Sequence, residues 1–483
     1  MTESLIRTSP TGTPPAAPPG AAGLGALGLC TVLIGSALPQ LDFFIVNVAL
    51  SSVGRDLDAS PALLELVVAG YSVAYAVLLV LGGRLGDTYG RRRLFLTGLA
   101  AFGLTSLACG LAPDAWTLIA ARVGQGAASA LMVPQVLAII QATTTGQRRA
   151  RAIGMYAAVA GLAMVAGQIL GGLLTAADLA GSGWRSVFLL NIPVVLAGLV
   201  LVWRVLPESR AERPAPVDLP GTALLAAALT TLLVPLTEGR AAGWPAWSWV
   251  LLALFPVAAL AFVAVERRAE RSGSTVPLVP PSLLRTAGMR RAMPPMMLCI
   301  GGFGGFMFVV ALTFQEGLRF GPVRAGTALV PYALAFFAAS LAGPRLAARF
   351  GPRLVTTGGL VQAVGVVALV AAVLRGWPDL GFLDLAPGLA VAGFGQGLQL
   401  PLLMRLVLAD IPPEQAGVGG GAMATAQQSA IALGVALLGA LFLALADSPG
   451  AMREALAITL TVQLAAVAVT TALSLRLGGG RTG

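Results

Sequence analysis

The charged residues Asp42 and Arg122 each lie inside an apolar stretch that is long enough to cross a bilayer. Asp42 lies in the stretch 24–48, and Arg122 lies in the stretch 116–140. A carboxylate at membrane depth is energetically costly unless it is paired, protonated or facing water. Reversible protonation is therefore the chemistry we expect at Asp42, while an arginine beside small residues can direct its guanidinium inward. In the ordinary alternatives, Asp42 caps a polar patch with Asn47 near the outer headgroups, and Arg122 extends to the membrane surface.

A third candidate is the run from Gly82 to Arg93, which lies between the apolar stretches 61–81 and 94–112. Small residues in this run allow two helix ends to approach closely through a tight turn. Asp87 can pair with a neighbouring arginine, or sit at a helix N-terminus where the dipole favours negative charge. The arginines hold the turn on the cytoplasmic side. The ordinary alternative is a positively charged loop that happens to contain glycines.

The composition excludes a soluble globular protein. Hydrophobic residues make up 57% of the chain and charged residues 11%, with a mean hydropathy of +0.85, whereas soluble domains carry about 25% charged residues. The chain has no histidine, which excludes a histidine-based zinc site and a Ser-His-Asp triad. Its three cysteines lack CxxC spacing, so neither a disulfide framework nor a metal site is indicated. We therefore expect no enzymatic activity, no metal and no cofactor.

The net charge of +10 has two interpretations. A basic chain can bind nucleic acid, but here the arginines fall between the apolar stretches. That distribution favours a role in membrane topology, beside anionic lipid. We therefore expect the partners to be the lipid bilayer, protons and a small-molecule substrate, with no nucleic acid, and we expect a monomer.

Fourteen apolar runs have the length of roughly 18 to 25 residues that a membrane-spanning helix needs. They lie at about 24–48, 61–81, 94–112, 116–140, 152–175, 187–205, 219–236, 247–265, 294–314, 326–344, 354–374, 385–408, 417–445 and 455–475. Each must be helical, because backbone groups in lipid have no water to bond. With both termini inside, most of the 31 arginines fall in cytoplasmic loops. The predicted fold is an all-α polytopic membrane protein with 14 transmembrane helices and cytoplasmic termini.

The loops divide the chain into segments of unequal length. The predicted segments are a disordered cytoplasmic tail at 1–23, an N-terminal six-helix bundle at 24–206, a linker and inserted two-helix hairpin at 207–265, a cytoplasmic loop at 266–293, a C-terminal six-helix bundle at 294–476 and a cytoplasmic tail at 477–483. The first tail is predicted to be disordered because Pro, Thr, Ser, Gly and Ala dominate it.

Motifs along the chain resemble those of the major facilitator superfamily and, more closely, those of its fourteen-span drug:proton antiporter branch. The superfamily loop G-x-L-x-D-x-x-G-R-R is matched by Gly83, Leu85, Asp87, Gly90, Arg91 and Arg92. The pattern L-D-x-T-I-V-N-V-A-L is matched by residues 41–50, with Phe44 in place of its threonine, and R-x-x-Q-G is matched by Arg122, Gln125 and Gly126. The pattern W-R-x-x-F-x-x-N-x-P is matched by Trp184, Arg185, Phe188, Asn191 and Pro193. The resemblance extends over the chain beyond the N-terminal tail and implies the major facilitator fold.

The fifth predicted span is similar to the antiporter signature G-P-x-x-G-G of the same branch. Gly167, Gln168, Gly171 and Gly172 occupy its positions, and Gly161 precedes them. Such small residues form a smooth face for close helix contact, and ordinary packing between helices would use them equally well. Gln168 replaces a proline that would bend the helix. Glutamine adds a donor and an acceptor, so Gln168 either bonds across helices or faces the cavity.

Two internal repeats support a duplicated bundle. Residues 344–353 repeat the pattern of residues 83–92, and residues 393–397 repeat the pattern of residues 122–126. Corresponding motifs in two halves are expected of a transporter that arose by duplication. The charges are lost in the second half, where Ala348 and Gly393 stand in place of the aspartate and the arginine. We infer that the N-terminal half carries the ion coupling.

The resemblance implies proton-driven export of small organic compounds, such as lipophilic drugs or antibiotics, across the plasma membrane by alternating access. Asp42 and Arg122 would couple protons, and the conformational latch would be Gly83, Asp87, Gly90, Arg91 and Arg92. The candidate substrate cavity is Asn47, Gln125, Gln315, Glu316 and Gln396, for which helix packing or a headgroup position is the alternative. The proton gradient would be the energy source. The alternatives are a dedicated exporter of one metabolite and a non-transporting membrane sensor.

Overall fold

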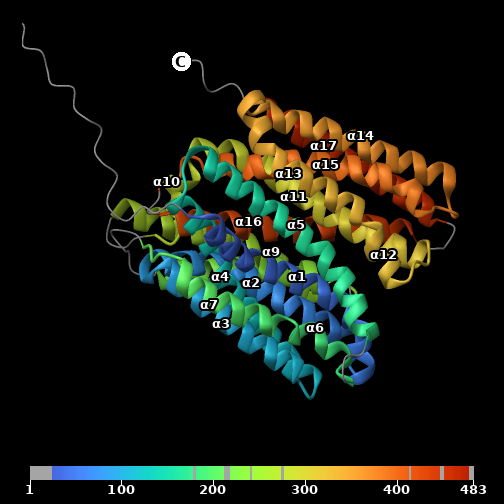
Figure 1. Cartoon of the computed structure of the whole chain (residues 1–483), viewed down its shortest axis with the longest axis horizontal. Helices are drawn as coiled ribbons and strands as arrows, with labels where there is room; N and C mark the ends of the chain where they lie inside the picture. The colour runs from blue at the N-terminus through green and yellow to red at the C-terminus, as the bar shows by residue number, and fades with distance from the viewer. Residues whose placement is uncertain are drawn as a thin grey trace, which may run out of the picture.

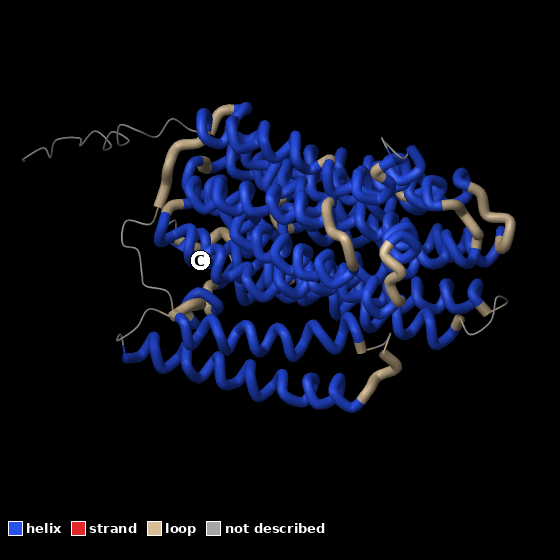
Figure 2. The backbone as a smooth tube through the Cα atoms, turned by 90° about the horizontal axis from the view of Figure 1, so that it is seen from below, coloured by secondary structure: helices blue, strands red, loops and turns tan. Residues whose placement is uncertain are grey.

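The computed structural model describes residues 24–177, 181–210, 218–239, 242–272, 277–412, 415–446 and 451–477. The cytoplasmic tails predicted at 1–23 and 477–483 lie outside these residues, apart from Leu477. Within the described part the chain contains helices and loops but no strand, as Figure 2 shows, and most loops lie at the two ends of the helices. The predicted all-α fold is confirmed.

The helices have the following bounds. They are α1 (Ala26–Asp56), α2 (Pro61–Tyr89), α3 (Arg91–Gly110), α4 (Ala115–Thr143), α5 (Gly146–Ala177), the 3₁₀ turn η2 (Gly183–Arg185), α6 (Ser186–Leu189), α7 (Asn191–Val205), α8 (Leu219–Glu238), α9 (Ala246–Ser272), α10 (Pro281–Leu284), α11 (Ala287–Leu312), the π-helical turn η3 (Thr313–Gly317), α12 (Pro322–Ala328), α13 (Val330–Phe350), α14 (Arg353–Gly376), α15 (Phe382–Val407), α16 (Ala416–Leu445) and α17 (Met452–Leu475).

Helix starts follow local capping chemistry. Ser60 precedes Pro61 of α2, and its Oγ accepts a hydrogen bond from the backbone N–H of Leu63. Asp114 precedes α4 and accepts from the N–H of Thr117 at 2.9 Å. That backbone bond lowers the pKa of Asp114 from its usual value. Both side chains satisfy N–H groups that have no partner within a helix.

Twelve helices in the described residues are long and apolar enough to cross a membrane. The other two predicted spans, 152–175 and 385–408, correspond to α5 and α15, which have 32 and 26 residues. The total of fourteen spans therefore stays a prediction. Helix α11 begins at Ala287, before the predicted start at 294, and Pro294 and Pro295 lie inside it. Packing among neighbouring helices allows a membrane helix to tolerate proline.

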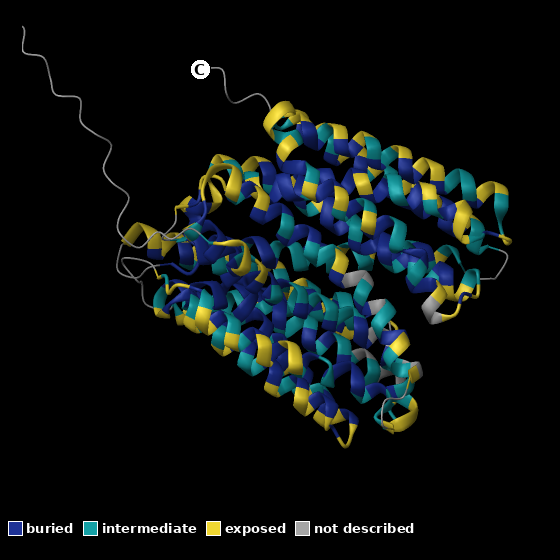
Figure 3. Ribbon diagram, in the orientation of Figure 1, coloured by how far each residue is buried: buried dark blue, intermediate teal, exposed yellow. Residues whose placement is uncertain are grey.

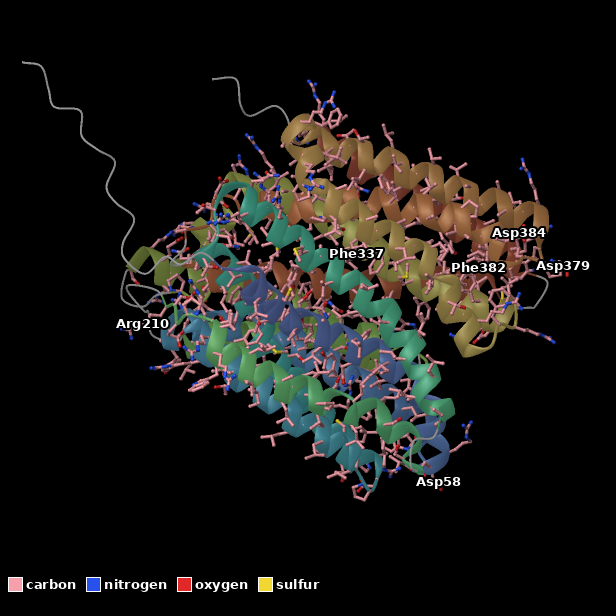
Figure 4. All side chains as sticks on the ribbon, in the orientation of Figure 1. Asp58, Arg210, Phe337, Asp379, Phe382 and Asp384 are labelled. Carbon is pink, nitrogen blue, oxygen red and sulfur yellow. The ribbon has the colours of Figure 1, made fainter. Side chains whose placement is uncertain are left out.

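The helices form two groups. Figure 1 shows the blue-to-green helices α1–α4, α6 and α7 on one side and the yellow-to-red helices α11–α15 and α17 on the other, with α5 running between them. Helix α16 belongs to the second group, because it packs on α11 and α17. The groups converge near α10 and diverge toward α6 and α12 (Figure 1). We call the end that holds α10 and Arg210 the arginine-rich end. Figure 4 labels Asp58, Asp379 and Asp384 at the opposite end.

The core joins the two groups unequally. One hydrophobic cluster contains buried residues of both, including Leu137 of α4, Leu403 of α15 and Val418 of α16. Two further clusters take their buried residues from one group each, around Phe188 in the first and around Phe442 in the second. Figure 3 shows exposed residues along the outer helix faces and buried residues between the helices. The hydrophobic cluster that both groups share therefore includes the first turn of α16.

Helices α8 and α9 lie outside this shared core. Leu229 and Leu233 of α8 pack against Ala76 of α2, with Ala432 of α16 beside them. Helix α9 packs on α8, and only 6% of its most apolar segment is buried inside the protein. This arrangement agrees with an inserted hairpin on the surface of two bundles, and the division of the chain into those segments remains a prediction.

Candidate functional site

Asp42 lies at the junction of α1, α4 and α7. Its side chain and that of Arg122 are completely buried, and Arg122 Nη1 donates to Asp42 Oδ2 at 2.5 Å. The other carboxylate oxygen, Oδ1, accepts from Gln125 Nε2 at 2.9 Å and from Asn191 Nδ2 at 2.8 Å. One cation and two amides therefore satisfy a charge that would otherwise be unsupported at membrane depth.

The position of Arg122 is set by its own contacts. Its Nε donates to the backbone oxygen of Val67 at 3.2 Å, and its Nη1 also donates to Gln125 Oε1 at 2.8 Å. The guanidinium carbon lies 4.2 Å from the centre of the Tyr71 ring, which is a cation–π arrangement. The hydroxyl of Tyr71 donates to the backbone oxygen of Pro39 at 3.1 Å. Arg122 is thus directed into the first helix group and does not extend to the membrane surface.

Glycine in the R-x-x-Q-G motif allows α4 to come close to α2. A Cβ added at Gly126 would lie 2.3 Å from the backbone oxygen of Tyr71, which no real side chain tolerates. This close approach brings Arg122 and Gln125 of α4 level with Tyr71. The motif therefore positions a charge by removing bulk one turn further along the helix.

Asn191 is the member of this site that the sequence argument did not assign a role. Its amide Nδ2 also donates to Ser106 Oγ at 3.0 Å, and Ser106 Oγ donates to the backbone oxygen of Phe188 at 2.9 Å. Among the described residues, Arg122 Nη2 and Asn191 Oδ1 have no hydrogen-bond partner. The signal that could have found Asn191 is a primary amide inside the apolar run 187–205.

Asp87 connects the two helix groups at the arginine-rich end. Its Oδ1 accepts from Arg91 Nη2 at 2.8 Å. Its two oxygens also accept from the backbone N–H groups of Gly417 at 3.2 Å and Val418 at 3.1 Å, in the first turn of α16. A carboxylate at that helix start satisfies unpaired N–H groups and complements the helix dipole. Sequence reasoning anticipated both partner types without locating α16.

Paired glycines allow this contact. A Cβ added at Gly83 would lie 2.1 Å from the backbone oxygen of Gly417, and a Cβ at Gly417 would lie 2.4 Å from the oxygen of Gly83. Helices α2 and α16 therefore touch through their backbones, next to Asp87. Both positions require glycine for this geometry.

The rest of the predicted latch lies within the first helix group. Gly90 adopts φ +108°, which favours glycine, and a Cβ there would approach the carboxylate of Glu208. The N–H of Arg91 donates to the backbone oxygen of Ser209 at 2.8 Å, and Arg92 Nη2 donates to the backbone oxygen of Trp203 at 2.7 Å. These contacts tie the α2–α3 turn to the end of α7, so Asp87 is the residue of the set that bonds to α16.

Helix α5 packs between the two groups through its glycines. A Cβ at Gly167 would lie 2.6 Å from the backbone oxygen of Leu41 in α1, and a Cβ at Gly161 would lie 2.8 Å from the ring of Phe336 in α13. Gly171 and Gly172 are buried. The side chain of Gln168 lies outside the described residues.

The candidate cavity residues whose side chains the structure describes make different contacts. Gln125 is completely buried and bonds to Asp42, and Gln396 is buried and accepts from the hydroxyl of Tyr332. Gln315 and Glu316 are exposed in the π-helical turn η3. The side chain of Asn47 lies outside the described residues. A cavity formed by this set stays a prediction.

Gly83→Ala is expected to force α2 and α16 apart, because the new methyl group would meet a backbone oxygen that cannot rotate away. Such overpacking costs about 1–3 kcal/mol. A lower unfolding temperature of the purified protein, measured in detergent, would report the effect. Gly343→Ala in α13 is the matched control, since a Cβ there meets nothing within 4 Å. Equal stability of the two variants would show that close contact at Gly83 is dispensable.

The sequence profile of the Major Facilitator Superfamily matches residues 32–235 and 220–435. The chain belongs to the major facilitator superfamily. It is a multi-pass membrane transporter and not an enzyme, as the composition predicted.

Two relatives place this transporter in the drug-efflux branch of the superfamily. A probable actinorhodin transporter of Streptomyces coelicolor is 38% identical over 419 residues, covering 86% of this chain and 72% of the relative. A cephamycin export protein of Amycolatopsis lactamdurans is 38% identical over 417 residues, covering 83% of this chain and 82% of the relative. The solved structure of the human organic anion transporter MFSD10 shares the fold, with a TM-score of 0.65, 18% identity, and coverage of 93% of this chain and 100% of that one.

Proposed function

We propose that this transporter exports a small organic compound of the antibiotic type and takes up protons in exchange. The observation that carries the proton part is the Asp42 carboxylate, which is completely buried beside one arginine and two amides. A proton on Asp42 would remove its charge and free Arg122 from its partner. Two protonation states with different contacts are what a coupled carrier requires.

The exchange cycle follows from the two sites. In the described conformation Asp87 holds the start of α16, which joins the helix groups on the predicted cytoplasmic side. In the proposed cycle, substrate leaves while the protein is open to the outside, and a proton then binds Asp42. Neutralising Asp42 favours the return to the inward-open state, in which Asp87 releases α16. Proton loss to the cytoplasm and substrate binding complete the cycle.

The driving force is sufficient for export. One proton moving across a potential of about 100 mV supplies about 2.3 kcal/mol. A gradient of about one pH unit adds about 1.4 kcal/mol. Together these support a concentration ratio of several hundredfold for a neutral substrate exchanged with one proton.

A dedicated exporter of one compound is the second candidate. The relatives described above carry the names of single antibiotics, actinorhodin and cephamycin. A dedicated exporter would confer resistance to one chemical series, whereas a multidrug pump would confer resistance to many. Measuring growth inhibition of an expressing strain by unrelated antibiotics separates the two.

Proton flux in everted membrane vesicles tests the proposal. Respiration acidifies the vesicle interior, and addition of a substrate of an antiporter releases protons outward. We expect such release with at least one aromatic antibiotic. Substrate transport without proton movement would remove proton coupling and leave an exporter. Absence of any response and of any binding across a broad panel would favour the non-transporting sensor.

A further inference from the structure

Two carboxyl groups meet where the inserted hairpin contacts α2. Asp218 precedes α8, and its Oδ1 accepts from the backbone N–H of Gly221 at 3.0 Å. Glu266 lies near the end of α9, and its Oε2 accepts from the N–H of Val279 at 2.9 Å. Glu266 is buried, with 1% of its surface exposed. Each carboxyl group thus has one oxygen engaged by the backbone.

The remaining two oxygens face each other. Asp218 Oδ2 and Glu266 Oε1 both lie 2.3 Å from the position that a Cβ at Gly221 would take, so the two oxygens share one small space. Neither oxygen has a donor among the described residues. Two carboxylate oxygens in contact repel each other unless a proton lies between them. The glycine at 221 provides the space for this pair.

The charges around the pair favour the binding of one proton. Arg84 of α2, 5% exposed, donates through Nη2 to the backbone oxygen of Pro277 at 3.2 Å, and its Nε has no partner among the described residues. Asp87 on the same helix is already paired with Arg91, so Arg84 is the buried cation that remains beside Pro277. With both carboxyl groups ionised, the cluster carries one uncompensated negative charge. A shared proton makes it neutral.

Apolar side chains pack beside this cluster. Leu278 and Val279 pack against Val80 of α2, with Leu225 of α8 and Phe262 of α9 beside them. The segment 277–279 therefore bonds to Arg84 through Pro277 and to Glu266 through Val279. It links the hairpin to α2 within one turn of Asp87.

We propose that Asp218 and Glu266 share one proton and form a second protonation site, which holds the hairpin and segment 277–279 against α2. Loss of this proton at alkaline pH places two negative charges in contact, and their repulsion pushes Glu266 away from Asp218 and out of its position against Val279. The hairpin contact is therefore strongest at acid pH and loosens as the pH rises. This site is separate from Asp42 and does not depend on the direction or substrate of transport.

Infrared difference spectroscopy of the purified full-length protein tests the shared proton. Between about pH 5 and about pH 9, where an ordinary carboxyl group is ionised over most of the range, we expect loss of a protonated-carboxyl carbonyl band. Glu266→Gln and Asp218→Asn should each remove this band, and Asp42→Asn should retain it. A band that persists in both hairpin variants would overturn the proposal.

Hydrogen exchange at Val279 tests the structural consequence. The amide of Glu266→Gln can donate to Asp218 while its oxygen still accepts from Val279, so this variant imitates the protonated pair and preserves folding. We expect equal exchange of Val279 in wild type and variant near pH 5, and several-fold faster exchange in wild type near pH 9, where the pair is ionised. Equal exchange of Val279 in wild type and Glu266→Gln at both pH values would contradict the proposed control of the hairpin contact.

Discussion

Asp42→Asn is expected to abolish substrate-driven proton release, because an amide cannot take up or lose a proton in this pocket. The substitution also leaves the completely buried Arg122 without its counter-charge. Breaking one side of a buried ion pair costs about 3–5 kcal/mol of folding free energy, so the purified variant should unfold at a lower temperature. In everted vesicles we expect substrate-driven proton release to fall to the background of vesicles that lack the transporter.

The variant Asp42→Asn/Arg122→Gln separates loss of coupling from loss of folding. Removing both charges relieves the unpaired buried cation, so thermal unfolding of the purified protein should return toward the wild-type temperature. Proton release should stay absent. Recovery of wild-type proton release in this double variant would exclude Asp42 as the proton carrier.

Asp56→Asn is the matched control on the same helix. Asp56 pairs with Arg185 at 2.5 Å but is substantially exposed. Hydrogen bonds from Arg185 and then Trp184 lower the pKa of Asp56 from its usual value. Its stabilising effect is therefore present above the pKa of the unfolded chain and is lost as the pH falls through the folded value. Since Asp56 stays ionised near neutral pH, its replacement should leave proton exchange unchanged.

Asp87→Asn is expected to slow transport at least about tenfold while changing substrate affinity much less, because charge-assisted bonds to a helix start contribute about 1.5–3 kcal/mol. The amide keeps one acceptor oxygen but loses the charge that pairs with Arg91 and the α16 dipole. Hydrogen exchange at Gly417 and Val418 should become faster, since these N–H groups bond to Asp87. Transport rates and binding affinities are measured on the same reconstituted protein.

Asp410→Asn is the control for this prediction. Asp410 accepts from the N–H of Gly288 at 2.8 Å, so it also holds a helix start. That contact joins α11 to the segment after α15, within the second helix group. We expect near-wild-type transport from this variant. Equal losses of transport and of substrate binding in Asp87→Asn would argue against a role in conformational cycling.

Sequence predicted the fold class and the charged members of the site for one physical reason. Lipid provides no hydrogen bonds and poorly tolerates charge, so long apolar runs must be helical and the rare charged residues inside them must be paired or functional. Asp42 and Arg122 stand out on that ground, and Asp87 stands out by its glycine- and arginine-rich motif between two apolar runs. Glycines at close helix contacts, such as Gly126, were visible as small residues in an apolar context.

The register between the two repeats was decided by tertiary packing. The sequence echo pairs Gly393 with Arg122, but a Cβ at Gly393 would lie 2.3 Å from the backbone oxygen of Tyr332, just as one at Gly126 would from Tyr71. Gly393 therefore corresponds in packing to Gly126, one turn further along. Glycines spaced four residues apart allow either register in the sequence, and backbone contact selects one.

Hydropathy likewise could not predict which residues far apart along the chain are in contact. Asn191 bonds to Asp42, Asp87 bonds to the start of α16, and Glu266 lies beside Asp218. Which side chains meet depends on the rotation and tilt of each helix, and packing against neighbours sets both. The sequence by itself determined a helical membrane transporter with its ionisable residues, and the tertiary structure decided which of them share a site.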